Sequence, residues 1–182
     1  MEKNLMIAGF GGQGVMMMGK LLASAVCEST DLNVTFFPSY GAEQRGGTAN
    51  CYVVLSDEPI GAPLGDRMDN LVVMNDPSLK KFLYKLKPDG TLFLNSSIVH
   101  TPSERQDIQI VAAPITEMAL EMGNAKVMNI IMLGVYIGYT SAISEELMLD
   151  AICHKLGKKA NLLELNKEAF AKGLVIGKAA RV

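Results

Sequence analysis

The sequence predicts an α/β fold, Rossmann-like, with a mostly parallel sheet, helices on both faces and a helical C-terminal portion. Up to residue 113, short apolar and β-branched runs alternate with segments of helical spacing, which is typical of parallel strands joined by helical crossovers. Beyond residue 114 only helical spacing recurs. The chain has 182 residues, and 49% of them are hydrophobic, so we expect a single domain over 1–182 with a buried core.

The strands are predicted from short apolar runs that end at Gly, Pro, Asn or Asp. They cover 4–8, 33–38, 48–56, 71–74, 91–95 and 108–112. The helices are predicted from apolar positions three to four residues apart. They cover 13–29, 79–87, 115–122, 126–139, 144–156 and 161–180. Asp76 or Ser78 is predicted to cap the second helix, and 88–90 is predicted to form a turn.

Charge and cysteine content exclude several classes of protein. The 17 Lys and Arg against 19 Asp and Glu give a net charge of -2, without the basic excess of a nucleic-acid binder. Cys27, Cys51 and Cys153 are isolated in the sequence, which excludes CxxC-type zinc and ferredoxin-type Fe–S motifs. His100 and His154 are too few for a recognisable metal site, so no metal is predicted on this chain.

The N-terminal apolar run superficially imitates a signal peptide. It contains five glycines together with Gln13 and Lys20, which are unusual in the apolar core of such a peptide. No stretch reaches the roughly 18 apolar residues that a membrane span requires. We therefore expect a cytoplasmic protein with no membrane partner, and the few unpaired thiols fit a reducing compartment.

A glycine-rich segment follows the first predicted strand. It has the pattern G-x-G-x-x-G at Gly9, Gly11 and Gly14, with Gly12 and Gln13 inside it. Glycines allow a tight turn and close approach of the backbone to a phosphate, and the following helix N-terminus offers free N–H groups. The same pattern also arises where a strand only packs closely on its helix. Anion binding and packing both remain open at this point.

Dinucleotide and mononucleotide motifs are incomplete around this turn. A Rossmann NAD site carries an acidic residue at the end of the second strand, about 20 residues after the last glycine. Here that strand ends in Phe36-Phe37-Pro38, and Asp31 lies before it. No Lys-Ser/Thr follows the glycines, which excludes a Walker A loop.

A second glycine-rich segment follows the second predicted strand. Its chemistry comes from Tyr40, Glu43 and Arg45, and it ends at Gly46 and Gly47. Arg offers a planar fork for carboxylate or phosphate groups, Glu can orient it, and Tyr offers a stacking face. In a parallel sheet this segment would lie at the same carboxyl edge as the first one, where α/β folds bind ligands. We expect the two segments to form one binding or interface site.

The two segments in this order resemble the gamma subunit of 2-oxoacid:ferredoxin oxidoreductases. The resemblance lies in Gly9-x-Gly-Gly-Gln-Gly-Val15 and in Pro38-Ser-Tyr-Gly-Ala-Glu-Gln-Arg-Gly-Gly-Thr-Ala-Asn50. It covers most of the chain and extends to Ser56-Asp-x-Pro-Ile60 and to Asn129. The Ser-Tyr-Gly-x-Glu-x-Arg-Gly-Gly variant is most similar to the 2-oxoglutarate type, and also to branched-chain 2-oxoacid enzymes.

The resemblance implies a reaction shared among several subunits. A 2-oxoacid is decarboxylated on thiamine diphosphate, electrons pass through Fe–S clusters to ferredoxin or flavodoxin, and the acyl group goes to coenzyme A. This chain lacks the Gly-Asp-Gly…Asn-Asn pattern expected to hold Mg²⁺ and thiamine diphosphate. It is therefore expected to carry no catalytic residue and no cofactor by itself. It would work only with alpha, beta and delta partner subunits, and its glycine edge would hold the phosphates of coenzyme A.

Other interpretations are a stand-alone nucleotide- or CoA-binding module and a monomeric NAD(P)-dependent reductase. The missing acidic residue after the second strand disfavours the reductase. A module should bind its ligand as a single chain, whereas a subunit should co-purify with a thiamine-diphosphate-binding partner. A homodimer is a further arrangement that the sequence leaves open.

Overall fold

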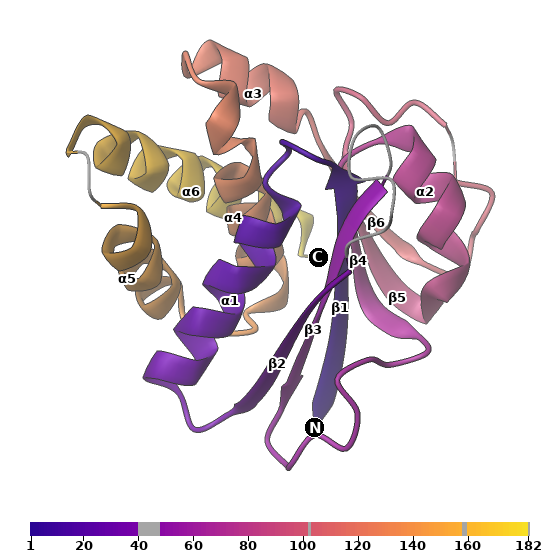
Figure 1. The fold of residues 1–182 in the computed structure, drawn as a ribbon. Helices are drawn as coiled ribbons and strands as arrows, with labels where there is room; N and C mark the ends of the chain where they lie inside the picture. The colour runs from indigo at the N-terminus through magenta and orange to yellow at the C-terminus, as the bar shows by residue number, and fades with distance from the viewer. Residues whose placement is uncertain (40–47, 102, 158–159, 182) are drawn as a thin grey trace.

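The computed structural model describes residues 1–39, 48–101, 103–157 and 160–181. They form a six-stranded sheet with helices on both faces (Figure 1). The strand order is β2-β3-β1-β4-β5-β6. The strands are β1 (Glu2–Phe10), β2 (Asn33–Ser39), β3 (Thr48–Ser56), β4 (Met68–Val73), β5 (Leu86–Asn95) and β6 (Gln109–Ala113). The predicted α/β class with a mostly parallel sheet is confirmed.

Strand β3 runs against the direction of its neighbours. It pairs antiparallel with both β1 and β2, whereas β1, β4, β5 and β6 are parallel to one another. The segment between β2 and β3 is short, and a short connection can join only antiparallel strands. Strand β2 therefore has the same direction as β1 but is separated from it by β3.

Six α-helices and two short 3₁₀ turns account for the rest of the described secondary structure. The helices are α1 (Val15–Ser29), α2 (Asp76–Phe82), α3 (Ile115–Glu121), α4 (Met128–Thr140), α5 (Glu145–Leu156) and α6 (Ala160–Ala180). The 3₁₀ turns are η1 (Leu83–Lys85) and η2 (Ala125–Val127). Within the described ranges, none of these helices is long and apolar enough to cross a membrane.

The two faces of the sheet bury separate sets of side chains. Alternate residues of a strand point to opposite faces, so Leu5 and Ile7 of β1 contact the larger helical layer. Met6 and Ala8 pack on the other side, in the smaller core that includes Phe82 of α2. Figure 1 shows α2 alone on one side of the sheet and the other helices on the opposite side. The C-terminal helices thus complete the larger core, as the change in spacing after residue 114 predicts.

Helices α4 and α6 approach each other through glycines. Gly134 and Gly138 of α4 face Gly173 and Gly177 of α6, and a Cβ atom on any of the four would overlap backbone atoms of the other helix. The missing side chains therefore let the two backbones touch. This contact fixes α6 against the most buried helix of the molecule.

The region of α2 and β5 differs from the sequence prediction. The cap of α2 is Asn75, whose Oδ1 accepts a hydrogen bond from the backbone N–H of Ser78 at 2.9 Å, and not Asp76 or Ser78. The helix begins at residue 76 and continues as a 3₁₀ turn, so the predicted bounds 79–87 are wrong at both ends. The predicted turn at 88–90 is an irregular start of β5, where Asp89 has φ 60°.

Candidate functional site

The first glycine segment lies at the carboxyl edge of the parallel strands, between β1 and α1 (Figure 1). The strand extends to Phe10, and α1 begins at Val15, two residues later than predicted. Gly11 and Gly12 are exposed in the turn that joins them. The backbone of this turn is therefore open to solvent at the edge where α/β folds bind ligands.

Gln13 makes three side-chain hydrogen bonds within the protein. Its Oε1 accepts hydrogen bonds from the backbone N–H of Phe10 at 2.7 Å and from Asn75 Nδ2 at 3.1 Å. Its Nε2 donates to the backbone carbonyl of Met74 at 3.0 Å. These three bonds connect the turn to the end of β4, so Gln13 shapes the site, and one of the two N–H groups of its Nε2 is not used by them.

Close packing explains two of the glycines. A Cβ atom on Gly9 would lie 2.9 Å from both Met74 Cβ and Val15 Cγ1, closer than real side chains approach. Gly14 has φ 75°, and a Cβ atom there would lie 2.6 Å from Asn129 Nδ2. Gly12 has φ 95° with open space around it. Close packing thus explains why Gly9 and Gly14 are glycines. It does not explain Gly12, which lies in the exposed part of the turn where a ligand could bind.

The N-terminus of α1 is uncapped. Its N-cap residue is Gly14, no acidic residue lies in the first turn, and no side chain among the described residues caps it with a hydrogen bond. The first N–H groups of a helix have no partner within it, and they carry a partial positive charge. This end of α1 can therefore accept an anion such as a phosphate.

Asn129 of α4 lies against this helix end. Its Nδ2 donates to the backbone carbonyl of Gly14 at 3.4 Å, and the residue is 7% exposed. Its Oδ1 is buried and has no hydrogen-bond partner among the described residues. A buried acceptor without a donor is costly, so this oxygen suits a ligand group that carries an N–H or O–H.

The second glycine segment lies outside the described residues, and with it the predicted site residues Tyr40, Glu43, Arg45, Gly46 and Gly47. Its two ends are described. Ser39 at the end of β2 is paired with Asn50, and Thr48 at the start of β3 is paired with Phe10. Both predicted segments therefore leave the sheet at one edge, as their positions in the sequence predict. The joint site of their side chains stays a prediction.

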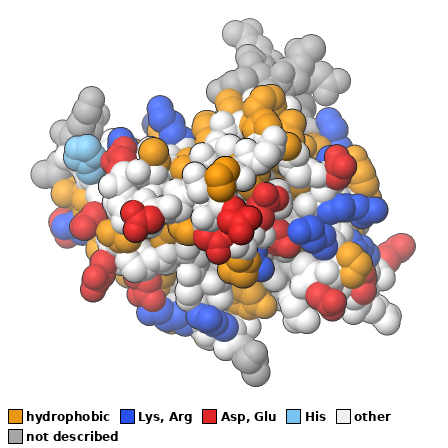
Figure 2. Space-filling view, turned by 90° about the horizontal axis from the view of Figure 1, so that it is seen from below, with side chains coloured by type: hydrophobic (Ala, Val, Ile, Leu, Met, Phe, Trp, Pro, Cys, Tyr) orange, Lys and Arg blue, Asp and Glu red, His pale blue; other side chains and the backbone are white. Residues whose placement is uncertain are grey.

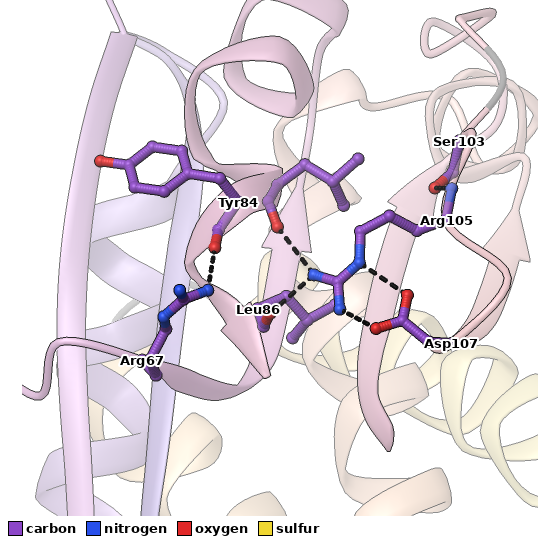
Figure 3. A network of polar contacts seen from close by, with 7 residues as sticks. Arg67, Tyr84, Leu86, Ser103, Arg105 and Asp107 are labelled. Carbon is purple, nitrogen blue, oxygen red and sulfur yellow. Dashed lines mark hydrogen bonds and ion pairs between the residues drawn. The ribbon is translucent and has the colours of Figure 1, made fainter. Parts of the chain in front are cut away.

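A cluster around Arg105 on the α2 side of the sheet is structural. Arg105 Nη1 donates to the backbone carbonyl of Leu86 at 2.6 Å, and its Nε donates to Asp107 Oδ1 at 2.8 Å (Figure 3). The Asp107 carboxylate raises the pKa of Arg105, and the guanidinium in turn lowers the pKa of Asp107. Nearby, Arg67 donates to the carbonyl of Tyr84. Arg105 therefore joins the connection before β6 to β5 and has little donor capacity left for a ligand, whereas the exposed Arg67 makes a single contact, to η1.

Metal-ligating chemistry is absent from the described part of the chain, where no group of three His, Cys, Asp or Glu could hold an ion. Cys51 is buried, and this burial raises the pKa of its thiol to about 12, so it remains protonated at neutral pH. Its Sγ donates to the backbone carbonyl of Val15 at 3.4 Å. The thiol closest to the glycine turn is therefore a packing group.

Sequence reasoning missed Asn75, and it named Asn129 only as part of the family resemblance, without a role in the site. Asn75 could have been recognised from Asn-Asp-Pro-Ser after an apolar strand, because Asn is a preferred N-cap and Pro fits the first helical turn. The neighbourhood of Asn129 has no such local signal, since its contact with Gly14 spans 115 positions of the sequence.

Comparison with known proteins gives consistent matches. A family model described as pyruvate ferredoxin/flavodoxin oxidoreductase matches residues 4–176. Ketoisovalerate oxidoreductase subunit VorA of Methanothermobacter marburgensis is 36% identical over 94% of this chain and 36% of its own length. The 2-oxoglutarate synthase subunit KorC of Methanocaldococcus jannaschii is 32% identical over 98% of this chain and 95% of its own length.

A solved structure matches nearly the whole fold. It is the 2-oxoglutarate:ferredoxin oxidoreductase from Magnetococcus marinus with 2-oxoglutarate, coenzyme A and succinyl-CoA bound, with a TM-score of 0.90 at 28% identity. The match covers 98% of this chain and 31% of that one. The chain therefore spans about a third of the length of VorA and of this structure's chain, and nearly all of KorC.

Proposed function

Because the chain belongs to the pyruvate ferredoxin/flavodoxin oxidoreductase family, we propose that it is the gamma subunit of a 2-oxoglutarate:ferredoxin oxidoreductase. The complex would convert 2-oxoglutarate and coenzyme A to succinyl-CoA and CO₂, and pass two electrons to ferredoxin or flavodoxin. The main support is the match to KorC, which extends over nearly the whole of both chains. The Ser-Tyr-Gly-x-Glu-x-Arg-Gly-Gly sequence at 39–47 favours the same substrate.

A branched-chain 2-oxoacid is the second candidate substrate. VorA, a ketoisovalerate enzyme subunit, has the higher identity of the two relatives, but this chain matches only about a third of it. Both candidates share one reaction type and differ in the 2-oxoacid side chain. In our proposal the groups that contact this side chain lie mainly on the alpha and beta subunits.

The chemistry of decarboxylation and electron transfer belongs to the partner subunits in this proposal. Thiamine diphosphate with Mg²⁺ requires carboxylate and amide ligands, and Fe–S clusters require cysteine thiolates. The described residues do not fit these groups, since they hold no cluster of metal ligands and Cys51 stays protonated. In the proposal these cofactors are therefore bound by other subunits of the complex.

The part that this chain plays is to hold coenzyme A. The exposed turn at Gly11 and Gly12 and the uncapped N-terminus of α1 would bind phosphate groups of the ligand. The unpaired Asn129 Oδ1 would accept from a hydroxyl or amide N–H of the same molecule. In the proposal, Arg45 of the second glycine segment adds a cation for a phosphate. The observation that carries this role is the buried Asn129 acceptor beside an uncapped helix end.

Co-purification and turnover test the proposed complex. The natively expressed chain should purify with larger partners that contain thiamine diphosphate. The complex should reduce ferredoxin faster with 2-oxoglutarate than with 2-oxoisovalerate or pyruvate. If the complex preferred 2-oxoisovalerate, it would instead be a branched-chain 2-oxoacid oxidoreductase. Purification of the chain alone, with CoA binding by the single chain, would support a stand-alone module instead.

Substitution of Asn129 tests the coenzyme A role within the complex. Asn129→Leu removes the acceptor at similar volume and should raise the KM for coenzyme A about tenfold, because a donor of the ligand loses its partner. The KM for the 2-oxoacid should stay unchanged. Asn33→Leu, at an exposed position at the start of β2, is the control. An unchanged KM for coenzyme A in the assembled variant would refute the role.

A further inference from the structure

A pocket opens at the sheet edge opposite the glycine turn, where the parallel strands begin. Its volume is about 400 Å³, and it lies between the amino ends of the strands and the C-terminal end of α4. Asn70 of β4 and Thr91 of β5 are at most 8% exposed, yet they line this pocket together with Ser56 of β3. The pocket therefore has a polar floor, and its size is in the range of specific binding sites.

An exposed apolar loop lies next to this pocket. The loop spans 57–67 between β3 and β4, and its first residue, Asp57, lines the pocket. Pro59, Ala62, Pro63 and Leu64 are exposed, and Leu64 is 40% exposed. Apolar side chains grouped at the surface beside a pocket are typical of interaction sites.

Both described ends of the chain lie at the same pocket. Met1 lines it, and Arg181 Nη1 donates at 2.6 Å to the Oγ of Ser141, another lining residue. VorA and the Magnetococcus marinus chain are about three times as long as the part they share with this chain. A segment joined to either end of this fold would therefore begin beside the pocket.

Among the described residues, carboxylates slightly outnumber cations at this edge. Exposed carboxylates lie on the loop at Asp57, Glu58 and Asp66, and Glu2 and Asp31 lie at the same ends of the strands. The cations there are Lys3, Arg67, Arg181 and the N-terminal amine, which pairs with Asp57. Figure 2 views this edge from below and shows acidic side chains near the middle of the face, with hydrophobic side chains and Lys or Arg side chains around them. A partner for this face would present basic and apolar side chains.

We infer that the pocket and the 57–67 loop form the interface for the separate subunit that corresponds to the remaining two thirds of the longer relatives. The occupant is a polypeptide segment of that subunit, with an apolar side chain against the loop and basic groups facing the carboxylates. This interface rests on the proposed function, because it requires a multi-subunit complex. It lies at the edge of the sheet opposite the proposed coenzyme A site.

Assembly of the co-expressed complex tests the interface. Leu64→Lys places a cation on the loop, where it would oppose a basic partner, and should raise the dissociation constant for the partner subunit at least about tenfold. Ala142→Trp, which fills the pocket, should have the same effect. Leu120→Lys in α3, a leucine that is 60% exposed outside the pocket lining and the loop, is the matched control and should change the constant by less than about twofold.

Thermal unfolding of each isolated variant separates misfolding from lost assembly. The inference is overturned if the folded Leu64→Lys variant binds the partner as tightly as the wild type does. A wild-type chain that fails to assemble with any partner would overturn the proposed function together with the interface. Assembly of the wild type and of both variants would refute only the interface.

Discussion

Gln13 Oε1 accepts a hydrogen bond from Asn75 Nδ2 at 3.1 Å, and this contact joins the residue before the N-cap of α1 to the N-cap of α2. Asn75 is fully buried, and its Oδ1 already caps α2. One pair of amides thus positions two helix starts at the carboxyl edge. The shape of the glycine turn depends on this pair as much as on the glycines.

Gln13→Glu should destabilise the protein at neutral pH. The new carboxylate can still accept from Phe10 and Asn75, but its second oxygen would face the carbonyl of Met74 in place of an N–H donor. We expect a loss of about 1–3 kcal/mol in the free energy of unfolding, measured by urea denaturation. Gln109→Glu, the same change at an exposed position of β6, should be nearly neutral. Equal stability of the two variants would contradict this account.

Gly173→Ala should destabilise the protein although alanine is the better helix former. In an open helix the change should add about 0.8–1 kcal/mol of stability. Here the new Cβ would overlap the carbonyl of Ile131 in α4, so the helices must separate. We expect a net loss of about 1–3 kcal/mol, visible as a lower Tm. Lys172→Ala, at the exposed neighbouring position, should leave the Tm almost unchanged, and a higher Tm for Gly173→Ala would disprove the close contact.

The cysteines should differ in their reactivity toward a thiol reagent. Cys51 is buried with its pKa raised to about 12 by that burial, whereas Cys27 is exposed on α1. The thiolate is the reactive form, so Cys51 should resist alkylation at pH 8 in the folded chain while Cys27 is modified. Mass spectrometry of the digested protein would locate the label. Both thiols should react in denaturant, and rapid labelling of Cys51 without denaturant would show that its thiol is accessible in the folded chain.

Asp76 should fix the segment that follows β5 in a pH-dependent way. Its carboxylate accepts a hydrogen bond from the backbone N–H of Thr101 at 3.0 Å. This bond is the main reason why the pKa of Asp76 is lowered, and further contacts with Thr101 and His100 lower it in addition. A carboxyl whose pKa is lowered by folding stabilises the native state at higher pH, and this contribution is lost as pH falls below about 4. Hydrogen exchange at Thr101 should therefore accelerate relative to the core in acid.

Asp76→Asn is the test of that assignment. The amide cannot ionise, so the protection of the Thr101 N–H from hydrogen exchange should already be reduced at pH 7. Lowering the pH should then cause no further loss of this protection. Asp89→Asn, an exposed aspartate at the irregular start of β5, should leave the profile as it is in the wild type. Identical pH profiles for the wild type and Asp76→Asn would exclude Asp76 as the titrating group.

Sequence patterns predicted the elements well where the signal is local. The bounds of β3 agree with the prediction 48–56, because the β-branched run there is bounded by turn residues. The antiparallel direction of β3 could not be predicted from alternation alone, since strand direction depends on pairing with a distant strand. In the site, the glycine turn was evident from the sequence. Its contacts with Asn75 and Asn129 bring together distant segments and became visible only in the fold.

The glycine contact between α4 and α6 also has a consequence for mutational surveys of this chain. Each of Gly134, Gly138, Gly173 and Gly177 faces backbone atoms that cannot move aside without parting two helices. A saturation screen scored by cell growth should therefore record a row of intolerant positions along α4 and α6. In the data, these positions could be mistaken for catalytic residues, although the glycines only allow the two helix backbones to touch. Scoring protein abundance next to activity would separate these positions from those of the glycine turn.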